Sequence, residues 1–156
     1  VLTALVILII YTSFQSNIIT KTINLARAID DDLNAKERAS PQDWIKLKDI
    51  SIYNDKIVLW ISNASWSKYS NTNSMDPFLD QDANGIELKP TNSNQLKKGD
   101  IISYRYKNLS IVHRIIKTGN DEEGWYAYTR GDNVRFRDPL KVRWEQVEGV
   151  LVAIIY

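Results

Sequence analysis

The stretch from Asp100 to Lys117 reads DIISYRYKNLSIVHRIIK and decides the fold. Isoleucine, valine and tyrosine dominate its two halves, Asp100 to Lys107 and Ser110 to Lys117. Runs of this kind favour strands, and the short interruption between them favours a turn. The stretch therefore predicts a β-hairpin that carries His113 on its second strand.

Further strands are expected on both sides of this hairpin. Eight tyrosines and five tryptophans against six glycines indicate a β-rich body with bulky strand faces. Val150 to Tyr156 is a continuous apolar run, which suits a strand buried on both faces. The other expected strands are Asp49 to Tyr53, Lys56 to Ser62, Gly85 to Lys89 and Trp125 to Arg130. The sequence thus predicts a mostly β domain of about seven short strands, carried on an amino-terminal helix, with Trp60 in the core.

The amino end differs from the rest of the chain. Val1 to Ile10 reads VLTALVILII, and the residues that follow as far as Ile19 include several hydroxyl and amide side chains. A helix that spans a membrane needs roughly 20 mostly apolar residues. Because the chain begins at valine rather than methionine, we expect residues upstream and interpret 1–19 as a partial transmembrane anchor. A cleaved signal peptide and a buried helix of a soluble domain are the alternatives.

Two further segments complete the expected organisation. Apolar residues between Ile19 and Leu33 recur every three or four positions, which is typical of a helix. We therefore expect 20–48 to be a juxtamembrane helical segment and 49–156 to be the β-rich domain.

Composition narrows the chemistry. The 156 residues include no cysteine, which excludes disulfides, thiolate nucleophiles and cysteine-bound zinc. One histidine argues against a histidine-based metal site. Twenty basic and nineteen acidic residues give a net charge of +1 without a basic block, so no nucleic-acid partner is expected.

Three side chains supply the parts of a nucleophilic hydrolase. Ser74 lies in a polar stretch, His113 is the single imidazole of the chain, and Asp138 follows a Gly131-Asp-Asn133 turn. A serine hydroxyl attacks once a base takes its proton, and a carboxylate can orient that base. An ordinary histidine, with a pKa of about 6.5, suits a general base at neutral pH.

Simpler interpretations of the same residues stay open. The surroundings of Ser74 suit an ordinary polar turn. A lone histidine on an apolar face, such as His113, is more often a satisfied core residue than a base. Either nearby carboxylate could instead form an ion pair with Arg135 or Arg137.

Four motifs, in this order, resemble those of type I signal peptidases. They are Asn73-Ser-Met-Asp-Pro77, Lys98-Gly-Asp-Ile-Ile102, Val112-His-Arg-Ile115, and Gly131-Asp-Asn133 with the later Asp138. The resemblance is to the archaeal and endoplasmic-reticulum branch, in which histidine replaces the lysine base of the bacterial enzymes. It covers roughly residues 67–156. The family usually has glycine where Asn73 stands, and glycine allows backbone dihedrals that asparagine adopts at more cost.

The resemblance implies a signal-peptidase-like irregular β-domain and a role for each site residue. Ser74 is the implied nucleophile and His113 the implied general base. Asp138 is the implied acid that orients the base. Asp132 is the alternative acid, and its simpler interpretation is that it holds its turn. The backbone N–H of Ser74 and the hydroxyl of Thr72 are the implied donors of the oxyanion hole. No cofactor is implied.

The implied activity is that of a membrane-anchored serine endopeptidase that removes signal peptides from exported preproteins. Residues 49–156 would form the peptidase domain, on the extracytoplasmic side of the membrane. The implied partners are preprotein signal peptides and the lipid bilayer, and a need for accessory membrane subunits stays open. Because an extended peptide points alternate side chains the same way, small residues are expected one and three positions before the cut. The residue between them is expected to face outward.

Two other functions remain open. A self-cleaving regulator of the same superfamily would use a serine–lysine dyad, with Lys98 or Lys117 as the base. A catalytically silent, membrane-tethered β binding module would keep the fold without the chemistry. An active-site-directed serine probe separates the silent module from the peptidases.

Overall fold

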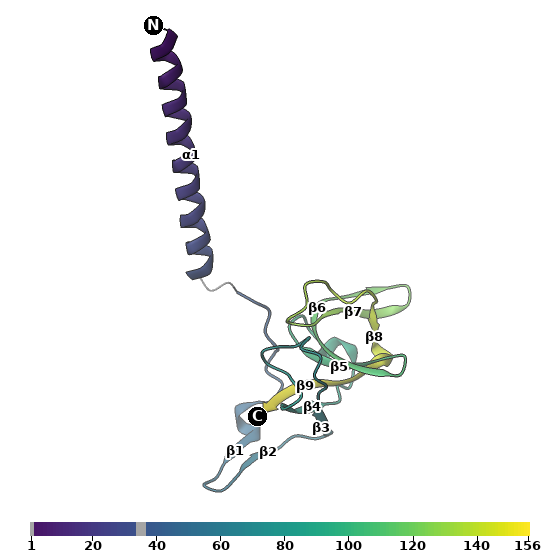
Figure 1. The fold of residues 1–156 in the computed structure, drawn as a ribbon. Helices are drawn as coiled ribbons and strands as arrows, with labels where there is room; N and C mark the ends of the chain where they lie inside the picture. Colours follow the sequence, from purple (N-terminus) through teal and green to yellow (C-terminus); the bar gives the residue numbers. More distant parts are fainter. Residues whose placement is uncertain (1, 34–36) are drawn as a thin grey trace. The chain divides into compact units, whose positions relative to one another are not determined.

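The structure is a computed structural model that describes residues 2–33 and 37–156 (Figure 1). It divides into two compact units, 1–37 and 38–156, and each is described by itself. Side chains are described for residues 12–29 and 37–156.

The first unit contains one helix, α1 (Leu2–Leu33), so the expected amino-terminal helix is confirmed. Across the described residues, no helix combines the length and the apolar character needed to cross a membrane. The first part of the predicted anchor, residues 1–11, lies outside the residues whose side chains are described.

The helix ends earlier than the sequence predicted. It stops at Leu33, and residues 37–46 form no helix before the short 3-10 helix η1 (Leu47–Asp49). The prediction of a helical segment over 20–48 was therefore wrong for 37–46. Pro41 supplies a physical reason, because a proline disfavours helical dihedrals in the residue before it.

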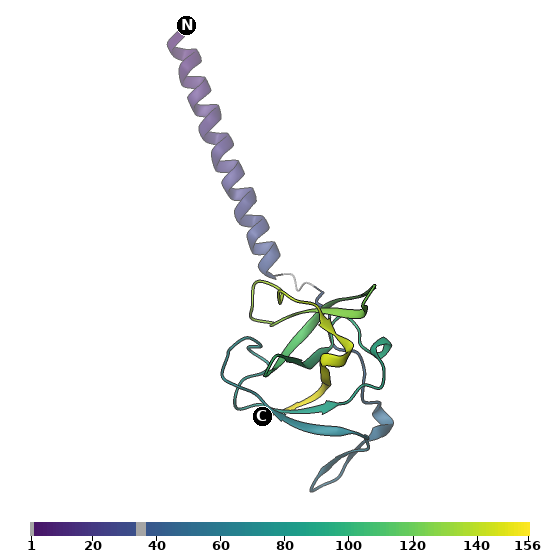
Figure 2. The same cartoon turned by 90° about the vertical axis from the view of Figure 1, so that its right-hand side faces the viewer.

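The second unit is built from antiparallel strands in two sheets, so the mostly β prediction is confirmed. The smaller sheet pairs β1 (Ile50–Ile52) with β2 (Ile57–Leu59). The larger sheet has the order β3-β4-β9-β5-β6-β7-β8, and Figures 1 and 2 show its strands curving rather than lying flat. Its strands are β3 (Ala64–Lys68), β4 (Asn84–Leu88), β5 (Ile101–Tyr106), β6 (Leu109–Asp121), β7 (Gly124–Arg130), β8 (Val142–Arg143) and β9 (Val147–Ile155). Two more 3-10 helices, η2 (Ser93–Gln95) and η3 (Trp144–Gln146), precede β5 and β9.

The predicted hairpin between Asp100 and Lys117 is confirmed as β5 and β6. Its register sets Ile102 opposite His113 and Tyr104 opposite Ile111. β9 pairs with the other edge of β5. One cluster of buried side chains packs around these three strands: Leu96, Ile102, Tyr104, Ile115, Ala127, Val142, Val147 and Val150.

A second buried cluster lies on the opposite face of β9 and β5. Successive residues of a strand point to opposite faces, so Val150 joins the first cluster and Leu151 joins the second. This confirms that the start of the predicted strand from Val150 is buried on both sides. The second cluster consists of Met75, Leu79, Ala83, Ile101 and Leu151. The residue after Ser74 is therefore part of the core.

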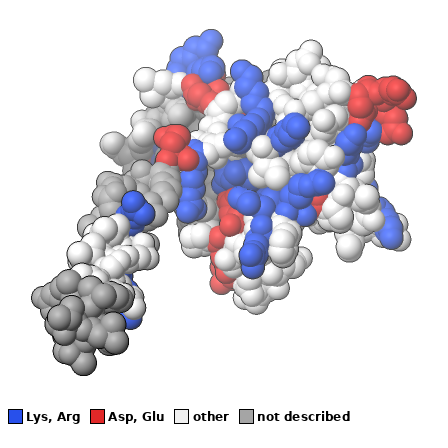
Figure 3. Space-filling model, turned by 90° about the horizontal axis from the view of Figure 1, so that it is seen from above, with Lys and Arg blue, Asp and Glu red and all other residues white. Residues whose placement is uncertain are grey.

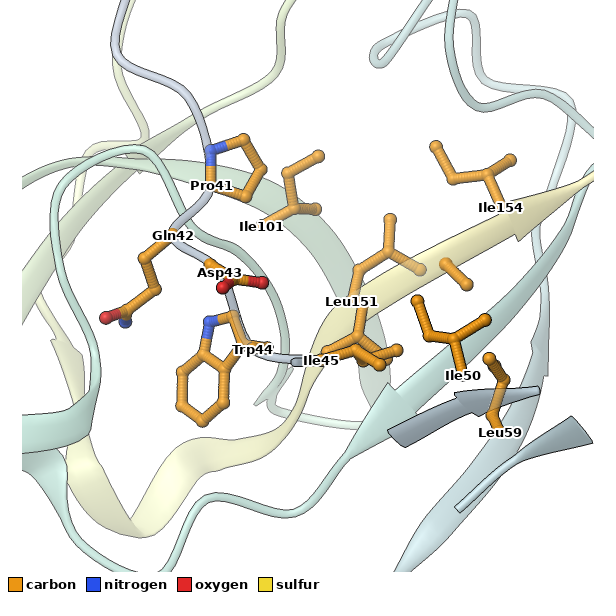
Figure 4. Close-up of a pocket in the computed structure, with 12 residues that line it drawn as sticks. Pro41, Gln42, Asp43, Trp44, Ile45, Ile50, Leu59, Ile101, Leu151 and Ile154 are labelled. Atoms are coloured by element: carbon orange, nitrogen blue, oxygen red, sulfur yellow. The ribbon is translucent and has the colours of Figure 1, made fainter. Parts of the chain in front are cut away.

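The β1–β2 hairpin stands apart from the main sheet. Its cross-strand pair Ile50 and Leu59 lines an apolar cavity of about 490 Å³, together with Leu151 and Ile154 of β9 (Figure 4). Trp60 follows β2 and is 63% exposed, so its predicted place in the core was wrong. A hairpin this short offers too little covered surface to enclose an indole ring.

Figure 3 shows charged side chains of both signs on one face of this unit. On the face drawn in Figure 3, lysines and arginines lie among uncharged side chains and scattered acidic ones. Several basic side chains of the unit are paired, among them Arg105 with Glu148 and Arg114 with Asp132.

Asp100 joins the chain before β1 to the main sheet. This fully buried carboxylate accepts hydrogen bonds from the backbone and side-chain amides of Gln42, at 3.1 and 2.8 Å. It also accepts the indole N–H of Trp44 at 3.0 Å and the backbone N–H of Lys97 at 2.8 Å. A buried carboxylate is stable only when its oxygens find such donors. This network explains why the compact unit begins at residue 38, before the predicted domain start at 49.

Asp100→Ala should therefore destabilise the fold strongly. Because four donors would lose their acceptor inside the protein, the free energy of unfolding should fall by at least about 3 kcal/mol. Urea titration of the full chain measures it. Asp43→Ala removes an exposed carboxylate of the same segment and should change stability by less than about 0.5 kcal/mol. Equal effects of the two substitutions would contradict the anchoring role of Asp100.

Candidate active site

Ser74 sits where a buried residue fixes an otherwise polar loop. The loop joins β3 to β4, and Met75 is held in the second cluster with 4% of its surface exposed. Just before the serine, Asn73 adopts a left-handed backbone with φ of 56°. Asparagine is one of the few residues besides glycine that visits this region at modest cost. The departure from glycine at this position is thus compatible with the sharp turn into Ser74.

His113 brings the serine and a carboxylate together. Its Nε2 lies 3.2 Å from Ser74 Oγ, and its Nδ1 lies 2.7 Å from Asp138 Oδ2. With its proton on Nδ1, the imidazole donates to the carboxylate, and Nε2 is left to accept the serine hydroxyl. The three side chains suggested by the sequence thus form one hydrogen-bonded chain.

Asp138 is held by three side chains from three neighbouring strands. Besides His113 on β6, Thr129 on β7 donates to Oδ2 at 2.6 Å and Tyr104 on β5 donates to it at 3.0 Å. Burial raises the pKa of Asp138, but the hydrogen bonds from His113, Thr129 and Tyr104 outweigh it and hold the pKa below its usual range. The carboxylate is therefore ionised at neutral pH.

Tyr104 is suited to its role as a donor. Burial is the main cause that raises its pKa far above the usual range, and the charge of Asp138 raises it further. The phenol thus keeps its proton. Sequence reasoning missed both Tyr104 and Thr129, because their place beside Asp138 depends on the register of three strands. The only local signal was the alternation that puts Tyr104 on the same face of β5 as Ile102.

Asp132 has a different partner. Its two carboxylate oxygens accept hydrogen bonds from Nε and Nη2 of Arg114, at 2.8 and 2.6 Å, which makes a two-point ion pair. Arg135 and Arg137, which the sequence offered as competitors, lie instead over the rings of Phe136 and Tyr128. The structure therefore separates the two candidate acids, with Asp138 on the imidazole and Asp132 on an arginine.

The Gly131-Asp-Asn133 turn clamps the backbone of the serine. The N–H of Asn133 donates to Ser74 O at 3.0 Å, and its side-chain amide donates to Asn73 O at 3.0 Å. A Cβ on Gly131 would lie 2.5 Å from Ser74 O and 3.0 Å from His113 Nε2. Only glycine permits that approach. The turn thus sets the position of Ser74 against His113.

Thr72 lies beside the nucleophile, as the sequence suggested. Its hydroxyl is 3.2 Å from Ser74 Oγ, and either oxygen can be the donor. Within the described part of the chain, no hydrogen bond occupies the backbone N–H of Ser74. The backbone N–H of Ser74 is therefore available to an oxyanion, whereas the hydroxyl of Thr72 would have to turn from Ser74 Oγ to donate to it.

The alternative lysine bases lie elsewhere. In the part of the chain that the structure describes, neither Lys98 nor Lys117 has a hydrogen bond to Ser74, and both are exposed. The described residues also contain no group of three or more His, Cys, Asp or Glu side chains arranged to hold a metal ion.

The arrangement can activate a hydroxyl for attack on a carbonyl carbon. A serine within hydrogen-bond reach of an imidazole, which is in turn oriented by a half-buried carboxylate, is the geometry of a nucleophilic triad. No protein-family model, curated protein or solved structure matches this chain. The chemistry of the site is therefore argued from its geometry.

The lowered pKa of Asp138 predicts a pH dependence of stability. A carboxyl whose pKa is lower in the folded chain stabilises the fold above its unfolded pKa, about 3.9, and loses that contribution as the pH falls. The free energy of unfolding should drop as the pH decreases through about 4, and the drop should be shallower in Asp138→Asn. Urea titrations between pH 7 and pH 3 test this, with Asp43→Asn as the exposed control. Identical slopes for wild type and Asp138→Asn would count against the inferred hydrogen bonding.

Proposed function

We propose that the protein is a membrane-anchored serine endopeptidase of the type I signal peptidase kind, which removes signal peptides from preproteins. The observation that carries the proposal is the hydrogen-bonded chain from Ser74 through His113 to Asp138. The order of the motifs along the sequence supports the choice of this class among serine hydrolases.

In this proposal each group of the site has a role. Ser74 Oγ attacks the scissile carbonyl carbon while His113 Nε2 takes its proton, and the imidazolium later protonates the leaving amine. Asp138 keeps the proton on Nδ1 and stabilises the charged ring. The backbone N–H of Ser74 and the hydroxyl of Thr72 donate to the oxyanion. Water then releases the acyl group by the same steps.

A free strand edge supports binding of an extended substrate. β6 pairs with β5 from Leu109 to Arg114, but it pairs with β7 only from Arg114 onward. Within residues 37–156, the second edge of 109–113 therefore has no strand partner. An extended peptide can add to such an edge through backbone hydrogen bonds. A peptide bound there would run past His113.

The substrate class follows from the two faces of that edge. Val112 packs against the second cluster, which includes Met75, the residue after Ser74. Residues one and three before the cut would face this filled core, which leaves room only for alanine, glycine or serine. The proposed substrates are therefore preproteins with small residues at those two positions.

Membrane attachment is part of the proposal. Its support is the apolar sequence from Val1 to Ile10. The peptidase unit would act on the extracytoplasmic side, where signal peptides emerge from the lipid bilayer. No cofactor takes part in the proposed steps.

Ser74→Ala should abolish cleavage of a preprotein by the detergent-solubilised protein. Loss of a triad nucleophile lowers the rate by at least about 10³-fold. The melting temperature should change little, because the hydroxyl contributes little packing. Ser70→Ala, an exposed serine of the same loop, is the matched control and should cleave at the wild-type rate. Near-full turnover by Ser74→Ala would rule out the mechanism.

The two carboxylates should separate into catalytic and structural effects. Asp138→Asn should lower kcat by about 10⁴-fold, because the amide no longer fixes the imidazole tautomer. Asp132→Asn should mainly lower stability, by about 1–3 kcal/mol, because it weakens the pair with Arg114. Rates and thermal melts of both variants measure this. Loss of activity in Asp132→Asn at an unchanged melting temperature would reverse the assignment.

A further inference from the structure

A second cavity opens beside the proposed catalytic acid. It has a volume of about 590 Å³. Aromatic and aliphatic side chains line it together with five polar or charged ones, Asp138, Glu123, Lys141, Arg143 and Gln146. The principal aromatic and aliphatic side chains are Tyr104, Tyr106, Ile111, Tyr128, Pro139 and Leu140. Nothing in the proposed chemistry requires this space.

The cavity lies on the same face of β6 as the imidazole. Ile111 and His113 are two residues apart on one strand, so their side chains point the same way. Ile111 and its cross-strand partner Tyr104 both line the cavity. Asp138 lines it too and is bonded to His113. The space therefore adjoins both the candidate triad and the free edge of 109–113.

The chemistry of the walls favours an uncharged occupant. Lys141 Nζ is 2.5 Å from one oxygen of Asp121, and Arg143 Nη1 is 2.7 Å from the other. Glu123 is paired with the same Arg143. Each charged side chain at the cavity, Asp138 included, thus already has a partner. The Gln146 amide is bonded to the backbone of Arg143 and Arg105, and the remaining walls are apolar or phenolic. An incoming charge would find no free counterion there.

We infer that this cavity is a specificity pocket for a large apolar side chain of the substrate; the inference rests on the proposed function. Neighbouring residues of an extended peptide face opposite sides. If the residues one and three before the cut face Met75, then those two and four before it face His113 and Ile111. The sequence alone suggested that the residue between the two small positions faces solvent. In this inference it enters the pocket instead. The pocket selects leucine, phenylalanine or another bulky apolar residue two or four positions before the cut.

The test is a peptide series with alanine fixed one and three positions before the cut. The second and fourth positions are varied in turn through alanine, leucine, phenylalanine, lysine and aspartate. With the full-length wild-type protein, leucine or phenylalanine at one of these positions should raise kcat/KM over aspartate by at least about tenfold. When variants are compared, the ratio of kcat/KM between two peptides cancels any effect of the substitution that is common to all peptides.

A charge swap then locates the pocket. Leu140→Asp should lower the leucine-to-alanine ratio of kcat/KM by about tenfold and raise the lysine-to-alanine ratio. Phe136→Asp is the matched control, since Phe136 belongs to the same loop, is 72% exposed and does not line the cavity. It should leave both ratios at their wild-type values.

Three results would overturn the inference. Cleavage that depends on Ser74 but is indifferent to both varied positions would remove the pocket and leave the proposed function intact. So would a wild-type leucine preference that Leu140→Asp and Phe136→Asp alter equally. Absence of any Ser74-dependent cleavage of the whole series would reject the proposed function, and the pocket with it.

Discussion

One oxygen of one carboxylate ties the site to the sheet. Asp138 Oδ2 accepts hydrogen bonds from Tyr104 on β5, His113 on β6 and Thr129 on β7, at 2.6–3.0 Å. A half-buried charge is costly unless it is fully hydrogen-bonded. The carboxylate can keep its charge here only if three adjacent strands hold their register. The pairing of β5 with β6 and of β6 with β7 is therefore a condition for the orientation of the imidazole.

The loop between β7 and β8 positions both Ser74 and His113. Its first residues, 131–133, hold the backbone of Ser74, and Asp138 follows on the same loop and holds His113. Arg114, next to His113 on β6, is paired with Asp132 and also donates to Gly99 O. The serine and the imidazole thus sit on separate segments that one loop fixes relative to each other. This shared support explains how a polar loop can present a hydroxyl in a defined position.

Most correct predictions of strands and site residues came from short-range patterns in the sequence. The β-branched runs gave the central hairpin, and the motifs named the three side chains that the structure brings together. The contacts of Tyr104 and Thr129 with Asp138 were beyond prediction, because strand register is a property of the assembled sheet. β3 was missed since Ala64–Lys68 shows no clear apolar alternation. The exposure of Trp60 depends on packing that local propensity does not encode.

The most direct test of the account is covalent labelling of the full-length protein with a fluorophosphonate, which phosphonylates an activated serine and releases fluoride. Digestion and mass spectrometry then locate the adduct. The account predicts stoichiometric labelling at Ser74, lost in His113→Ala and retained in Ser70→Ala. Labelling at another serine, or none in the correctly folded wild-type protein, would contradict it.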